Sequence, residues 1–70
     1  MKLDEYKENQ TRAAIFPGLV VEIVLKKDQP TGKLTRGIVQ KILTNSPYHW
    51  RGIKVMLMNG QVGRVQNVIH

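Results

Sequence analysis

The sequence contains no cysteine, and that absence excludes several classes of protein. Without thiols the chain can form neither a disulfide scaffold nor a thiolate metal site, and a chain of this kind is typical of a reducing compartment. Residues 1–10 are charged where a secretory signal would be apolar, and Glu22 interrupts the best apolar run, residues 19–25. We therefore expect a cytoplasmic protein that has no membrane-spanning segment.

Residues for catalysis and metal binding are also scarce. The chain has two histidines, His49 and His70, and no carboxylate is placed by the sequence to orient His49. Glu22 and Asp28 stand alone, so paired-carboxylate chemistry has no visible basis. Two histidines also fall short of the four ligands that a structural metal site usually takes. We expect no enzyme activity, no metal site and no cofactor.

Acidic residues are absent from the second part of the 70-residue chain. Residues 1–28 carry five basic and five acidic side chains, whereas residues 29–70 carry six basic and none acidic, which accounts for the formal net charge of +6. A domain without internal anions has a positive surface potential and attracts polyanions. Nucleic acid is the favoured partner. The alternatives are a charge that only aids solubility and some other acidic partner.

What the sequence does contain is a series of short β-strand patterns. Residues 19–26 alternate with Leu19, Val21, Ile23 and Leu25 on one face, and further strands are predicted over 34–43, 53–58 and 61–69. Loops rich in Gly, Pro, Asp and Asn separate them, and no convincing helix appears. We predict an all-β fold, a small SH3-like antiparallel barrel of four to five strands over residues 15–70, with a flexible or weakly helical tail over residues 1–14.

Two glycines predict the shape of particular strands. Asn59-Gly60 is typical of a two-residue type I′ hairpin, in which both central residues have positive φ. The register of such a hairpin would turn Val65 outward, so we expect a bulge near Gly63 that returns Val65 to the core. Gly37 inside the second strand predicts another bulge or a sharp bend.

The loop over residues 44–52 gathers aromatic rings and a cation. Tyr48, Trp50 and Arg51 follow one another closely, and rings of this kind stack on the bases of single-stranded nucleic acid. Trp50 could instead fold back to cap the small barrel. Tyr48 is then the better stacking candidate.

Cations on the predicted strands complete a candidate binding surface. If the sheet curls, several can share one face at the spacing of phosphates; a solvated charged rim is the alternative. The candidates are Arg36, Lys41, Lys54 and Arg64 from the strands, with Lys33 and Arg51 from the loops.

Several stretches of the chain are similar to a known family. They read KDQ at 27–29, TGKLTRG at 31–37, ILTNS at 42–46, GIKV at 52–55 and GQVGRV at 60–65. With these motifs the chain resembles the YwbE-like family of small bacterial and archaeal proteins over about three quarters of its length, a resemblance that implies no particular activity. By fold analogy, the last strands look like the SH3-like barrels that carry KOW-type motifs.

Two functions from different classes remain. The first is a non-catalytic module that binds nucleic acid, RNA more than DNA, through phosphate contacts and aromatic stacking with low sequence specificity. The second is a protein-interaction module that uses an open barrel edge or a surface formed by Met56, Met58 and Trp50. We favour a monomer.

Overall fold

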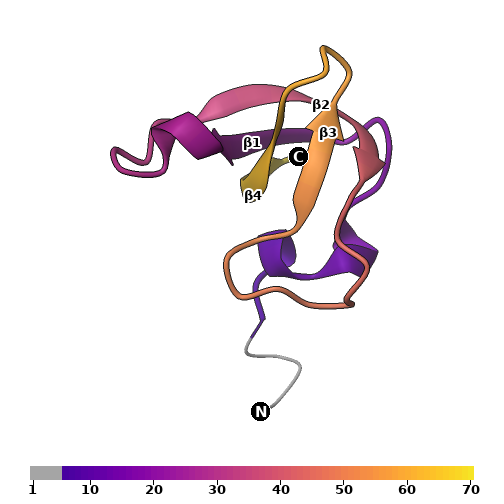
Figure 1. Cartoon of the computed structure of the whole chain (residues 1–70). Helices are drawn as coiled ribbons and strands as arrows, with labels where there is room; N and C mark the ends of the chain where they lie inside the picture. The colour runs from indigo at the N-terminus through magenta and orange to yellow at the C-terminus, as the bar shows by residue number, and fades with distance from the viewer. Residues whose placement is uncertain (1–5) are drawn as a thin grey trace.

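The computed structural model describes residues 6–70, which form a closed antiparallel barrel of four strands (Figure 1). The strands are β1 (Val20–Leu25), β2 (Thr35–Ile42), β3 (Lys54–Leu57) and β4 (Val62–Ile69), and β4 closes the barrel by pairing with β1. Three single-turn 3-10 helices accompany them: η2 (Glu8–Gln10), η3 (Arg12–Ala14) and η4 (Lys26–Asp28). The prediction of a small all-β barrel is confirmed. Within residues 6–70 no helix is long and apolar enough to cross a membrane.

Alternation along the strands builds the core. Val21, Ile23 and Leu25 of β1 are buried, as the sequence pattern predicts, while the intervening residues are half-buried. The remaining members of the core come from the other three strands, from the residue just before β3 and from the segment before β1: Ile15, Val39, Ile53, Val55, Leu57 and Val65. Closure of the sheet thus gives a short chain a continuous apolar centre, because a flat sheet of this size would leave one face in water.

The hairpin between β3 and β4 differs from the prediction. The Gly60 amide donates to the Leu57 carbonyl at 2.9 Å, and the Leu57 amide donates to the Gln61 carbonyl at 2.8 Å. Gly60 has φ of +88°, whereas no non-glycine residue between 6 and 70 has positive φ. The loop therefore has three residues and a bulged glycine, and the prediction of a type I′ turn is wrong.

This turn sets which residues of β4 face inward. Val55 lies opposite Gly63, and Lys54 lies opposite Arg64. Simple alternation then buries both Gly63 and Val65, so the predicted bulge near Gly63 is wrong. Arg64 points to the outer surface as a result.

The irregular positions of the sheet are two glutamines. Between β4 and β1 the register shifts so that Gln66 has no partner on β1, and between β2 and β3 a shift leaves Gln40 unpaired. Gly37 pairs in register with Val21, so of the bulge or sharp bend predicted there, the bulge is wrong. A Cβ atom at Gly37 would lie 2.5 Å from a methyl carbon of Leu57, which explains glycine at this position by close packing.

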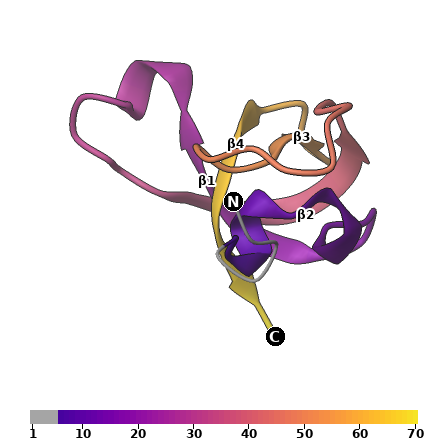
Figure 2. The ribbon, with the colours of Figure 1, turned by 90° about the horizontal axis from the view of Figure 1, so that it is seen from below.

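The described part of the expected tail is attached to the barrel. Figure 2 shows the N-terminal turns lying across one end of the barrel, while the loop after β1 projects from its side. The Asn9 carbonyl accepts from the Ile53 amide at 2.9 Å, and the Asn9 side chain donates to the Val65 carbonyl at 3.0 Å. The expected weak helicity takes the form of η2 and η3. Residues 1–5 of the tail lie outside the described residues.

Candidate nucleic-acid interface

A groove of about 670 Å³ runs along one side of the barrel. Its lining residues come from η2, from the loop over residues 43–53, from β4 and from the loop after β1. Three cations, one carboxylate, one aromatic ring and a set of amides give it its chemical character: Lys7, Arg51, Arg64, Glu8, Trp50, Asn9, Gln10, Gln29, Gln66 and Asn67. Such a mixture can hold an anion and stack a planar group at the same time.

Trp50 lies at the surface of this groove. Its exposed fraction is 73%, so the alternative in which it caps the barrel is wrong. The Arg51 guanidinium lies 5.6 Å from the centroid of the Trp50 ring, within the range of a cation–π contact. A large apolar ring that is held open to solvent beside a cation is available to a ligand.

The N-terminal segment positions the loop that carries Trp50. The Gln10 side chain donates to the Trp50 carbonyl at 2.7 Å, and the His49 amide donates to the Gln10 carbonyl at 2.9 Å. The Arg12 amide donates to the Pro47 carbonyl at 2.8 Å. These contacts satisfy backbone groups that a free loop would leave to water, and they join two segments about forty residues apart in sequence.

Arg64 connects the same loop to β4. Its guanidinium donates to the Gly52 carbonyl at 3.0 Å, and its cross-strand neighbour Lys54 is exposed on the same outer surface. Gly52 is buried with φ of +103°, and a Cβ atom there would collide with the Val65 carbonyl oxygen. Only glycine lets the loop approach β4 this closely. Arg64, Arg51 and Lys54 thereby form one basic cluster at the groove.

His49 reports the electrostatics of this cluster. Burial, followed by the positive charges of Arg64 and Arg51, lowers the pKa of His49 from its ordinary value. Its Nδ1 accepts a hydrogen bond from the Arg51 amide at 3.2 Å, which suits a neutral ring. In residues 6–70 no three His, Asp or Glu side chains converge as ligands of a metal ion.

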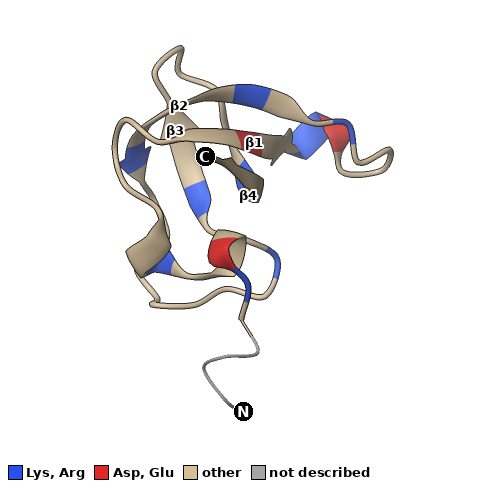
Figure 3. Cartoon of the chain, turned by 180° about the vertical axis from the view of Figure 1, so that it is seen from behind, with Lys and Arg blue, Asp and Glu red and all other residues tan. Residues whose placement is uncertain are grey.

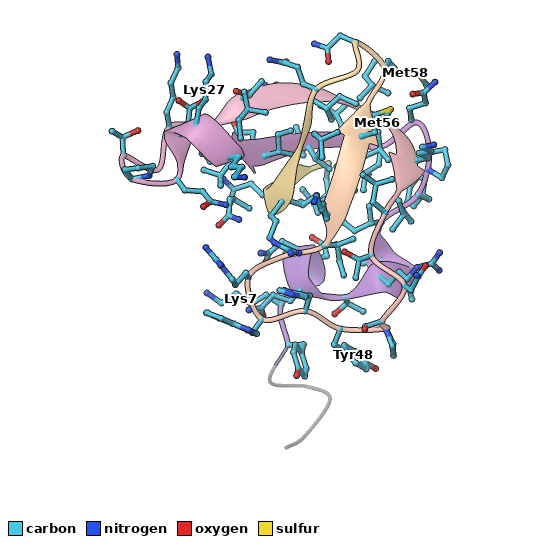
Figure 4. The ribbon with its side chains drawn as sticks, viewed as in Figure 1. Lys7, Lys27, Tyr48, Met56 and Met58 are labelled. Atoms are coloured by element: carbon cyan, nitrogen blue, oxygen red, sulfur yellow. The ribbon has the colours of Figure 1, made fainter. Side chains whose placement is uncertain are left out.

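Two strand cations lie outside the groove. Arg36 pairs across the sheet with Glu22 at 3.3 Å, and Glu22 also accepts from Asn67 at 3.0 Å, so the charge of Arg36 is already partnered. Lys41 lies opposite Met56 in the register of β2 and β3. In Figure 4, Met56 and Met58 point away on the side of the barrel opposite to Lys7.

The other two predicted residues are also displaced from the groove. Tyr48 stacks on Tyr6 with ring centroids 4.7 Å apart and is half-buried, whereas Trp50, although it lies beside the His49 ring, is mostly exposed and is the better stacking residue. Lys33 is exposed next to Gly32, which lines the groove, in the loop after β1. Lys7 was not predicted, because nothing in a polar N-terminal sequence indicates that it meets residues 50 and 64.

The cations as a whole do not gather on one face. Figure 3 shows Lys and Arg on strands and loops at several sides of the barrel, with acidic residues at few positions among them. The structure therefore replaces the predicted common face by a smaller set around the groove: Lys7, Arg51, Lys54 and Arg64.

Comparison with known proteins places the chain in a family. Residues 8–68 match the family described as "Uncharacterized conserved protein (DUF2196)". The chain belongs to this family. It is 57% identical over 60 residues to the uncharacterized protein YwbE of Bacillus subtilis (strain 168), an alignment that covers 86% of this chain and 92% of that protein. The resemblance seen in the sequence motifs is thus confirmed. No solved structure matches the chain.

Proposed function

We propose that this protein is a non-catalytic module that binds single-stranded RNA in the groove beside Trp50. The observation that carries the proposal is the pairing of an exposed tryptophan with Arg51 and Arg64 along one groove. A base stacked on a protein ring contributes about 1–3 kcal/mol, and neighbouring cations hold the phosphates that flank it.

The exposed ring of Trp50 favours a single strand over a duplex. The exposed ring of Trp50 can stack only on a base that is itself unstacked, and bases are accessible in this way in single strands and loops. Backbone phosphates can then reach Lys7, Arg51 and Arg64, which all line the groove. Contacts of this kind recognise the phosphate backbone and any planar base, so they carry little sequence information.

A salt titration tests this function. Binding of a fluorescently labelled eight-nucleotide RNA is followed by anisotropy, and quenching of Trp50, the only tryptophan, is followed in parallel. With three or four phosphate contacts, the logarithm of the association constant should fall with the logarithm of salt concentration at a slope of about −2 to −3. A flat response, or no binding at low salt, would refute the proposal.

Two matched variants connect binding to the groove. Arg51→Ala should weaken binding and make the slope less steep by about 0.7, because one phosphate contact is lost. Lys41→Ala removes the same charge on the other side of the barrel and should leave the slope unchanged. Trp50→Ala should weaken binding by about 1–3 kcal/mol with little change in stability, since the side chain is exposed.

Protein interaction remains a second candidate function, and a separate surface favours it. Met58 and Ile38 are 58% and 45% exposed, and the Met58 amide donates to the Ile38 carbonyl at 2.8 Å, so the two lie side by side. Met56 and Met58 lie on a side of the barrel away from the Trp50 groove. The single surface expected from Met56, Met58 and Trp50 is therefore two separate surfaces. A partner that is captured in the presence of nuclease and lost in Met58→Lys would support this function.

A further inference from the structure

Five side-chain amides line the groove, and three of them bond to the protein through the amide nitrogen alone. These three amides belong to Asn9, Gln66 and Asn67. Each has one end that can only donate hydrogen bonds and one that can only accept them. The chemistry of the neighbouring groups therefore decides which end faces the protein and which end is available to a ligand.

Every one of these amides turns its nitrogen toward the protein. The Gln66 nitrogen donates to the backbone carbonyl of Arg51 at 3.2 Å and also lies within 3.4 Å of the carbonyl of Arg64. The Asn67 nitrogen donates to the Glu22 carboxylate at 3.0 Å. The Asn9 nitrogen donates to the Val65 carbonyl at 3.0 Å. Carbonyl and carboxylate oxygens only accept, so the reverse orientation would place oxygen against oxygen.

The amide oxygens are consequently left for a ligand. Within residues 6–70 no hydrogen bond ends on Oδ1 of Asn9, Oε1 of Gln66 or Oδ1 of Asn67. The groove thus combines cations for phosphate with acceptors for N–H groups. A ligand that matches both sets carries an anion and a planar group with N–H donors.

We propose that the groove prefers RNA bases that carry an exocyclic amino group, with cytosine bound more tightly than uracil. This inference rests on the proposed RNA-binding function. The two pyrimidines have the same size and stack alike, but cytosine presents an N4 amino donor where uracil presents an O4 acceptor. Oxygen acceptors at the groove pair with the amino group and repel the O4 atom. Uracil offers a single N–H donor, N3–H, between the O4 and O2 acceptors, so it satisfies fewer of the groove's oxygens than the two-hydrogen amino group of cytosine, which costs affinity.

The test compares labelled hexanucleotides of cytidine and uridine at one low salt concentration. One additional hydrogen bond corresponds to a preference for cytidine of about three- to tenfold. A third hexanucleotide contains N4,N4-dimethylcytidine, which keeps the ring but has no amino hydrogens, and it should bind no better than uridine. Asn67→Ala and Gln66→Ala should each reduce the preference, whereas Gln40→Ala, an exposed glutamine away from the groove, should retain it.

The outcomes separate this inference from the function on which it rests. Equal, salt-dependent binding of cytidine and uridine would overturn the base preference and leave RNA binding intact. Tight binding of the dimethylated oligomer, or an undiminished preference in folded Asn67→Ala and Gln66→Ala, would overturn the role of the amide oxygens. If no hexanucleotide binds at low salt, the proposed function itself is refuted.

Discussion

The two long loops of the barrel both carry cations, yet they are held in different ways. In the loop after β1, hydrogen bonds stay within the loop, such as the one from the Gly32 amide to the Asp28 carbonyl at 2.8 Å. The loop over residues 43–53 is instead bonded to the N-terminal segment, through the backbones of Asn9, Gln10 and Arg12. Only the second loop has its position fixed by a remote part of the chain.

This difference explains where the candidate site lies. A side chain such as Lys33, on a loop bonded only to itself, loses conformational freedom when a ligand orders it. Arg51 and Trp50 lie on a loop that is already ordered by contacts at both ends, so less entropy is lost on binding. Its attachment therefore suits the loop over residues 43–53 better than the loop after β1 for holding a ligand without a large loss of entropy.

The largest expected effect is the loss of stability when a glycine of either loop is replaced. Gly52 and Gly32 both have positive φ. At Gly52 a Cβ atom would collide with the Val65 carbonyl, whereas at Gly32 nothing lies within 4 Å. Gly52→Ala combines backbone strain with that collision and should lower the free energy of unfolding by at least about 2–3 kcal/mol. Gly32→Ala has only the backbone strain and should cost about 1 kcal/mol.

Urea or thermal unfolding of both variants measures the contrast. For a domain of this size each kcal/mol corresponds to about 4–8 °C in Tm, so the two should be clearly separated. Similar losses for both glycines would show that the two loops are equally constrained and would contradict the difference in their attachment.

A smaller effect is expected when the attachment itself is weakened. Gln10→Ala removes the 2.7 Å hydrogen bond to the Trp50 carbonyl and should cost about 0.5–1.5 kcal/mol in stability while increasing the mobility of Trp50. The matched control is Gln29→Ala. Gln29 lines the groove from the other loop, so its replacement should change neither the stability nor the mobility of Trp50. The fluorescence anisotropy of Trp50 reports the mobility. Equal anisotropy in the two variants would mean that Gln10 does not hold the loop.

Much of the fold was predictable from the chain, because burial follows a period of two along each strand. The inward set of β1 and the residues Ile53, Val55 and Leu57 were predicted correctly on that basis. The hairpin register was not, since Asn-Gly suits both a two-residue turn and the first part of a three-residue turn with a bulged glycine. The three-residue loop itself places Arg64 on the outer surface and Val65 in the core, so the burial of Val65 was predicted correctly but its cause was not.

The candidate site was only partly predictable. Trp50, Arg51 and Arg64 are candidates from the sequence, and the structure brings them together at one groove. The contribution of Lys7 and the stacking of Tyr48 on Tyr6 depend on where the N-terminal segment packs. Strand periodicity contains no information about that packing, because η2 and η3 are single turns without an apolar repeat of their own.

The smallest expected effect concerns His49, whose pKa is lowered by burial and by the charges of Arg64 and Arg51. Because the folded protein binds this proton less readily than the unfolded chain, His49 should reduce stability as the pH falls through its ordinary value of 6.5. A phosphate held beside the two arginines offsets their charge and should raise the pKa of His49.

An NMR titration of the His49 ring with and without the eight-nucleotide RNA measures this shift. Arg51→Ala should raise the pKa of His49 in the absence of RNA, because it removes one of the two positive charges. A base that covered the ring without bringing a phosphate to the arginines would increase burial and lower the pKa further. The sign of the change therefore distinguishes RNA held through phosphates at the attached loop from RNA held only by stacking on Trp50, and a lowered pKa would contradict the arrangement proposed here.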